Sequence, residues 1–246
     1  KEQISECYDV VRGLEARQIS ALHSVLGELK AHDIRILPYD QLDATDRSYL
    51  RDYYHDNIFP LITPQAMDPA HPFPFISNLS LNLLVQVRYP GKVTKTALTR
   101  IKIPVGNGVP RFLQLPDRNH FVAVEDVVRN NLEMLLPEME VLSHYMFRVT
   151  RNANTERNEE HADDLLSMIE SELRERRFAP IVRLQIQADM DDTTRGMLAA
   201  EMGLNEEADV FNAEHELLAL RDLFQVAGLD VPELHSPDHH PIDNPD

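Results

Sequence analysis

The chain has 246 residues, of which 24 are Lys or Arg and 41 are Asp or Glu, so its formal net charge is −17. An apolar content of 43% and a charged content of 26% exclude a chain that is disordered throughout, and the length suits one large or two modest domains. The single cysteine excludes a disulfide scaffold, and no apolar run approaches the roughly 20 residues of a membrane span.

The N-terminal part is predicted to be helical. Apolar residues recur at helical spacing through residues 1–32 and predict one long amphipathic helix, in which Cys7 is expected to pack in the core. Asp43 or Thr45 is a suitable N-cap for a second helix over residues 46–58. We expect the two helices to form an antiparallel hairpin, part of a helical bundle whose third helix is missing.

A proline-rich segment follows the second predicted helix. Five prolines fall within residues 60–75, which forbids a helix and favours an extended connection, so we place a domain boundary between residues 60 and 61. Beyond it, alternating apolar residues and a Pro90-Gly91 turn signal predict an antiparallel meander. The predicted strands cover residues 79–89, 96–103, 111–115 and 121–124.

The remaining sequence alternates between helical and extended patterns. Helices are predicted over residues 125–136, 158–177, 193–202 and 214–227, and extended segments over residues 140–150, 181–188 and 209–211. Helices packed on a largely antiparallel sheet define an α+β fold. The predicted organisation is therefore a partial helical domain (1–60), a mixed α/β domain (61–228) and a proline-containing linker (229–246).

The sequence contains none of the usual catalytic signatures. It has no glycine-rich phosphate loop and no GxSxG elbow. A histidine-rich stretch at His235, Asp238, His239 and His240 resembles a metal cluster, but its proline-rich setting favours a solvated linker. We therefore predict no catalytic residue and no metal ligand within this chain.

The segment at residues 68–82, which reads DPAHPFPFISNLSLN, resembles the start of the middle domain of the long-chain polyphosphate kinase family. The resemblance continues through residues 100–104, 110–112, 124–127 and 147–151, and through the helix that ends at Arg177. It therefore extends over nearly the whole chain. His71 belongs to the first of these motifs, where its proline neighbours favour a structural role in a turn.

This resemblance implies an enzyme of four parts, with a helical N-terminal domain, a middle or head domain associated with dimerisation, and two C-terminal domains. Such enzymes transfer the γ-phosphate of ATP reversibly to polyphosphate through a phosphohistidine, with Mg²⁺ as the expected metal. The family's LNRELSW motif and both C-terminal domains have no counterpart here, and the chain begins at Lys1 without a methionine. It is therefore expected to be an inactive piece of a longer enzyme, with neither ATP nor Mg²⁺ bound to it.

Two alternative functions are considered for this part, the first from the resemblance and the second from its basic residues. The first is dimerisation and scaffolding, for which the aromatic clusters at residues 49–54 and 73–75 would suit an interface, although such clusters more often pack internally. The expected location is the cytoplasm, with peripheral membrane association left open, and no nucleic-acid partner is expected.

The second is an alternative function, a stand-alone module that binds polyphosphate as a polyanion. Residues 61–118 contain seven basic residues and only two acidic ones, and the candidates are Arg100, Lys102 and Arg111. Arg100 and Lys102 are expected on one face of a strand because side chains two residues apart share a face. Arginine also suits bidentate contacts to phosphate. The alternative is that these cations pair with the chain's own carboxylates across the sheet.

Overall fold

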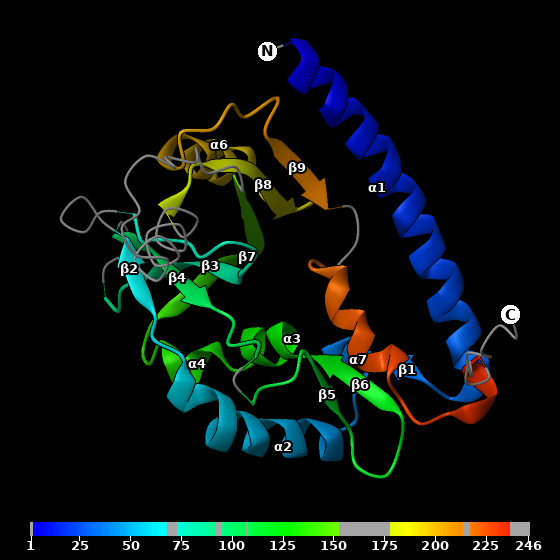
Figure 1. The fold of residues 1–246 in the computed structure, drawn as a ribbon. Coiled ribbons are helices and arrows are strands. Elements are labelled where there is room, and N and C mark those ends of the chain that lie inside the picture. Colours follow the sequence, from blue (N-terminus) through cyan, green and yellow to red (C-terminus); the bar gives the residue numbers. More distant parts are fainter. Residues whose placement is uncertain are drawn as a thin grey trace, which may run out of the picture.

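Two β-sheets and the helices that cover them make up the chain (Figure 1). The computed structural model describes residues 2–67, 73–91, 95–106, 108–152, 178–213 and 217–236. The larger sheet has six strands in the order β2-β4-β3-β7-β8-β9, and only the β8–β9 pair is parallel. Its strands are β2 (Gln65–Met67), β3 (Leu81–Arg88), β4 (Thr96–Lys102), β7 (Glu140–Arg151), β8 (Ile181–Gln187) and β9 (Val210–Ala213).

The smaller sheet has three strands in the order β1-β6-β5. They are β1 (Arg35–Ile36), β5 (Phe112–Gln114) and β6 (His120–Ala123). The α-helices are α1 (Glu2–Leu29), α2 (Ala44–Tyr53), α3 (Val124–Arg129), α4 (Leu132–Leu135), α6 (Asp192–Glu201) and α7 (Phe224–Ala227). A π-helical turn (Tyr54–Ile58) extends α2, and 3-10 turns cover Lys30–His32, Tyr39–Gln41, Phe59–Leu61, Leu220–Leu223 and Pro232–Leu234.

Local sequence explains where several of these elements begin and end. The side chain of Asp43 accepts a hydrogen bond of 2.9 Å from the backbone N–H of Asp46 and caps α2. Asp191 caps α6 in the same way. Gly91, in the turn between β3 and β4, has a φ of 69°, a conformation that glycine adopts without steric cost.

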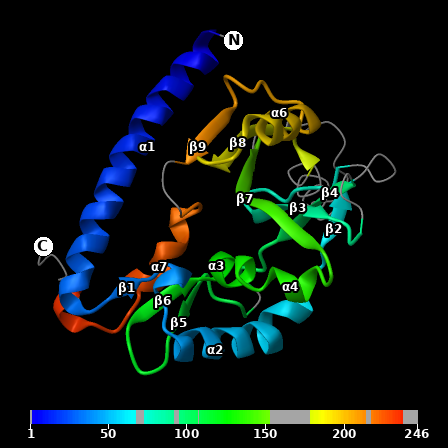
Figure 2. The same ribbon diagram turned by 180° about the vertical axis from the view of Figure 1, so that it is seen from behind.

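The larger sheet is buried on both faces. On one face of the sheet, β3 contributes residues 81, 83, 85 and 87 to a hydrophobic core. This core also contains Leu50 and Tyr54 of the α2 region and residues of α3, α4, β5 and β6. Leu84 packs on the other side, beneath α6. A third cluster joins Ile34, Phe121 and Val226, and so connects the end of α1 to the smaller sheet and α7. Figure 2 shows the same layers from behind.

The α+β fold is confirmed, with its N-terminal helix and mostly antiparallel sheets, but the expected helical hairpin is not formed. Figures 1 and 2 show α1 along one side of the molecule and α2 along its base, with the smaller sheet between them. The reason is β1, which leaves α1 and pairs in parallel with β6. As a result, α2 packs in the core of the larger sheet instead of against α1.

Other expectations require correction. The predicted strands at residues 111–115 and 121–124 form, but in the separate smaller sheet. The helix expected over 125–136 is split into α3 and α4, and within the described part of 214–227 helical turns cover only residues 220–227. Cys7 is exposed, not packed in the core. The helix predicted over 158–177 lies outside the described residues.

The proposed boundary at residue 60 stays a prediction. Helix α2, on its N-terminal side, shares a core with β3 and β4. At the other boundary, Leu229 and Val231, the first apolar residues of the predicted linker, pack against the third cluster. Within the described part of the chain, no helix combines the length and the apolar character that crossing a membrane requires.

Candidate functional site

Arg100 carries a buried positive charge on β4. The residue is only 6% exposed. Its Nε donates a hydrogen bond of 2.8 Å to Oδ1 of Asn82, and its Nη1 donates one of 2.6 Å to Oε1 of Gln65. Both acceptors are neutral amides, and Arg100 forms no ion pair with any carboxylate of the described residues. Burial lowers the pKa of Arg100 to about 10, so the side chain remains charged at neutral pH.

The register of the sheet brings these three side chains together. Gln65 lies directly opposite Arg100 on the edge strand β2, and Asn82 lies opposite Lys102 on β3. Residues 82, 100 and 102 therefore share one face of the sheet, as the sequence predicts for the two cations. Lys102 is exposed at the end of β4 and forms no ion pair within the described part of the chain.

Two other arginines of the basic segment follow the alternative interpretation and pair with carboxylates. Arg88 contacts Glu140 across the β3–β7 pair at 2.7 Å, and Arg118 forms an ion pair with Asp46 at the start of α2. The excess of basic residues at 61–118 is therefore not one continuous basic surface. Among the arginines of that segment, Arg100 differs because its partners within the described part of the chain are neutral amides.

The structure does not bring Arg111 to the face of Arg100 and Lys102. Arg111 directly precedes β5, is 2% exposed, and forms a bidentate ion pair with Glu125 of α3. Its Nη1 also donates to Oδ2 of Asp222 at 3.3 Å and to the backbone oxygen of Leu218. Burial raises the pKa of Glu125, and the guanidinium of Arg111 works against that rise. This network joins three segments that are distant in the sequence.

Two arginines of β7 were not singled out from the sequence, although they lie in the motif at residues 147–151. Arg148 is half-buried and donates to the backbone oxygen of Leu79 and to the amide oxygen of Gln185, each at 3.2 Å. Its pKa is lowered, first by burial and then by the charge of Arg183. Among the described residues, Arg151 donates hydrogen bonds only to backbone oxygens. The motif was the available signal.

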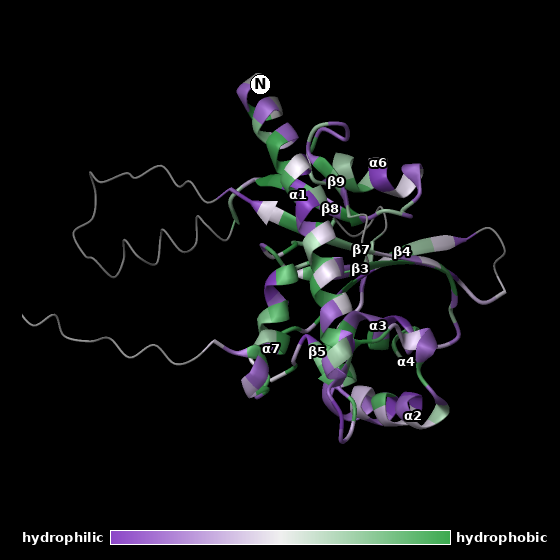
Figure 3. Ribbon diagram, turned by 90° about the vertical axis from the view of Figure 1, so that its right-hand side faces the viewer, coloured by the Kyte–Doolittle hydropathy of each residue, from purple (hydrophilic) through white to green (hydrophobic). Residues whose placement is uncertain are grey.

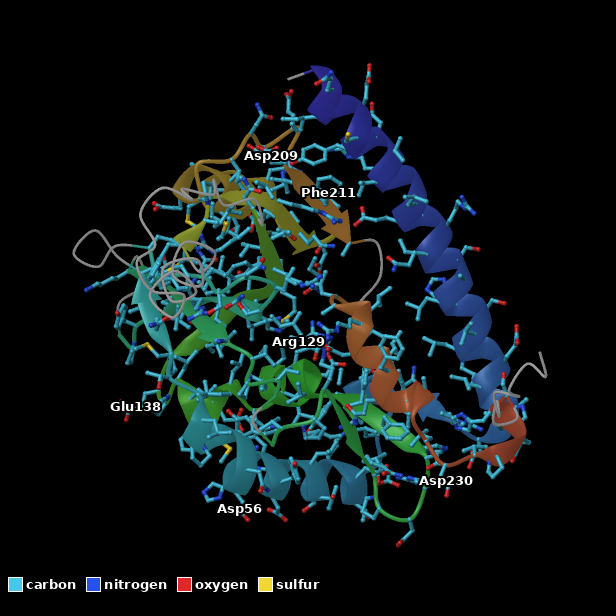
Figure 4. All side chains as sticks on the ribbon, viewed as in Figure 1. Asp56, Arg129, Glu138, Asp209, Phe211 and Asp230 are labelled. Atoms are coloured by element: carbon cyan, nitrogen blue, oxygen red, sulfur yellow. The ribbon has the colours of Figure 1, made fainter. Side chains whose placement is uncertain are left out.

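Helix α1 contacts the larger sheet through an aromatic and charged cluster. The ring of Phe211 on β9 lies between two guanidinium groups, with its centroid 4.7 Å from Cζ of Arg12 and 4.2 Å from Cζ of Arg183. Tyr8 packs edge-on against the same ring at 5.3 Å, and Glu15 forms an ion pair with Arg183. Phe211 is labelled on β9, facing α1, in Figure 4, and Figure 3 shows α1 crossing both sheets.

A cavity of about 660 Å³ lies beside this cluster, between α1 and β9. Its lining contains Arg12 and Arg195 but also Glu15 and Glu206. Nε of Arg195 contacts Oε1 of Glu206 at 2.8 Å, so this cation is already paired. The cavity therefore offers no excess positive charge to an anion.

The candidate metal and histidine positions give no centre within the described chain. No group of three or more His, Cys, Asp or Glu side chains there is arranged to hold a metal ion. A ring nitrogen of His235 lies 2.6 Å from the backbone oxygen of Leu229. His71, Asp238, His239 and His240 lie outside the described residues.

The sequence pattern of the polyphosphate kinase middle domain matches residues 45–226. The chain is 41% identical to a polyphosphate kinase of Thermosynechococcus vestitus, covering 87% of this chain and 30% of that protein. It is 37% identical to a polyphosphate kinase of Mycobacterium leprae, covering 98% of this chain and 35% of that protein. The chain thus spans about a third of the length of these curated relatives.

A solved structure has the same fold. The crystal structure of polyphosphate kinase from Porphyromonas gingivalis matches 98% of this chain and 35% of that chain, with a TM-score of 0.79 and 20% sequence identity. At this identity the structural likeness supports the fold alone. The evidence for a common family comes from the sequence relatives and the domain match.

Proposed function

The chain belongs to the polyphosphate kinase family and contains its middle domain, and from that premise we propose that it is a non-catalytic scaffold of a larger enzyme. In the complete enzyme, the γ-phosphate of ATP would be transferred reversibly to polyphosphate through a phosphohistidine located outside this chain. The present residues would hold the domains together and provide the surface for dimerisation.

The observation that best supports a scaffolding role is the closed network around Arg111. A buried guanidinium that served a substrate would keep donors directed toward an open site. Arg111 instead contacts Glu125 of α3 and, in a second segment, Asp222 and the backbone of Leu218. These contacts fix α3, β5 and the 3-10 turn that leads into α7 relative to one another, which is a structural task.

An ATP-to-polyphosphate transfer assay with labelled ATP tests this proposal. The isolated chain should show only the background measured without protein, and no label should remain on the polypeptide after denaturation. Sustained transfer, or a covalently labelled side chain, would refute the scaffold assignment. A full-length family enzyme serves as the positive control.

We assign ATP and Mg²⁺ to the complete enzyme and propose that neither binds to this chain. The proposal also includes a cytoplasmic location, with or without peripheral membrane contact.

The proposal further includes homodimerisation through this domain. Tyr49 and Phe75 are exposed and available to an interface, whereas Tyr54 is buried in the core. Light scattering over a concentration series tests dimerisation, and a monomer at every concentration would contradict it.

A further inference from the structure

We propose that Arg100, Gln65, Asn82 and Lys102 form a binding site for a phosphoryl oxyanion, with a polyphosphate chain as its ligand. The choice of ligand rests on the proposed function, because it is the polymer that the complete enzyme would handle. The site itself rests on the geometry of the β2-β4-β3 part of the larger sheet.

The first argument is a comparison between two buried arginines of the same chain. Arg111 and Arg100 are 2% and 6% exposed. Arg111 has two carboxylates within 3.3 Å, as expected of a buried charge that the fold neutralises internally. Arg100 has two amide oxygens and no carboxylate partner among the described residues. Within the described residues, this buried cation therefore has no counter-charge.

The second argument concerns the donors that remain. A guanidinium has five N–H groups in a fixed plane, and the bonds to Asn82 and Gln65 use two of them. Nη2 of Arg100 has no hydrogen-bond partner among the described residues, and it is not among their fully buried unpartnered nitrogens, so it keeps a free donor at an accessible position. The two amides hold the guanidinium in one orientation while leaving its charge and its outer donors to a ligand.

The third argument is the position of Lys102. It lies on the same face of β4, two residues from Arg100, which corresponds to roughly 6.6 Å along a strand. It is exposed and, within the described chain, unpaired. A single phosphate would contact Arg100 alone, whereas a chain of phosphates could reach both cations. This spacing favours a polymer, and the planar guanidinium favours an oxyanion with two acceptor oxygens.

The test is calorimetric titration of the 246-residue chain with polyphosphate of defined length, with separate arms using inorganic phosphate and ATP. The variants are Arg100→Met, Lys102→Ala and, as the matched control, Lys95→Ala. Lys95 immediately precedes the same strand, but its Nζ lies 4.8 Å from the ring centroid of Tyr89, away from the site. Each titration is done at about 50 and about 200 mM salt, because phosphate contacts lose affinity steeply with salt.

We expect polyphosphate to bind the wild-type chain more tightly than inorganic phosphate or ATP. Arg100→Met should weaken polyphosphate binding by about tenfold or more, because hydrogen bonds to a charged group are lost. Lys102→Ala should weaken it by about two- to fivefold and reduce the salt dependence, and Lys95→Ala should stay within about twofold of wild type. Without ligand, Arg100→Met removes a buried charge but also leaves Oδ1 of the buried Asn82 without its donor, so its unfolding temperature is measured beside the titrations to show that the variant is folded.

The proposal would be overturned if wild type and Arg100→Met bound polyphosphate equally well, or if the wild-type chain bound none of the three ligands. Inorganic phosphate binding as tightly as the polymer would overturn the choice of ligand. If Arg100→Met does not fold, the effects of Lys102→Ala and Arg100→Lys decide, because Arg100→Lys keeps the charge and removes the planar fork. If polyphosphate does not bind at Arg100, the transfer assay of the isolated chain should still show only background. If the isolated chain does transfer phosphate, the measured affinities for polyphosphate do not change. The two proposals can therefore be refuted independently.

Discussion

Replacing Arg111 by methionine should destabilise the chain strongly, and the structure allows the size of the effect to be estimated. The substitution leaves the carboxylate of Glu125, 2% exposed, without its bidentate partner. Removing one member of a buried ion pair costs about 3–5 kcal/mol. For a chain of this size each kcal/mol corresponds to a shift of about 2–4 °C in Tm, so we expect a decrease of about 6–20 °C.

The pH dependence gives the prediction a second readout. Without the guanidinium, burial should raise the pKa of Glu125 further above its value in the unfolded chain. A group whose folded pKa is raised lends stability below its unfolded pKa and loses it as pH rises through its folded pKa. The difference between Arg111→Met and wild type should therefore be small near pH 5 and larger near pH 8.

Urea unfolding at both pH values measures these differences, and the double variant Arg111→Met/Glu125→Gln is the control. It contains neither buried charge, so it should recover much of the stability that the single variant loses. A single variant within about 1 kcal/mol of wild type at pH 8, or a double variant no more stable than the single one, would refute the structural role of this pair.

Three further predictions follow from single side chains. Tyr54→Phe should be neutral or stabilise by up to about 1 kcal/mol in urea unfolding, because the buried Tyr54 hydroxyl has no partner among the described residues, and a clear loss would contradict this. Asp43→Ala should cost about 1 kcal/mol through loss of the cap on α2, and an unchanged midpoint would show the cap to be dispensable. Burial lowers the pKa of His144, so the contribution of this residue to the free energy of unfolding should be fully present above about pH 6.5 and should decrease as pH falls below that value. His144→Gln should flatten this part of the stability profile.

The contrast between Arg100 and Arg111 has a consequence for the complete enzyme. Both side chains are buried and lie within the residues that match the family's middle domain, but among the described residues only Arg111 is paired with carboxylates. If Arg100 binds polyphosphate, the scaffold would also guide the polymer, and the two proposed roles would belong to one domain. The binding and transfer experiments are designed to separate these contributions.

Local sequence was sufficient for most of the secondary structure. The alternation of apolar residues in β3, the Asp43 cap of α2 and the Pro90-Gly91 turn act over a few residues, so β3 and α2 could be placed close to their observed bounds. The α+β fold class followed from the order of helical and extended patterns, and the family resemblance followed from contiguous motifs. Within the site, the spacing of Arg100 and Lys102 correctly placed both on one face of β4.

Long-range pairing decided the rest. The hairpin prediction was wrong because residues 35–36 pair with β6, more than 80 residues away, and no local pattern specifies such a partner. Arg100, Lys102 and Arg111 look alike in the sequence, since the charge of a side chain does not reveal its environment. Only the tertiary structure gave Arg111 its carboxylates and Arg100 its amides, because burial and counter-charges come from strands and helices that meet only when the chain folds.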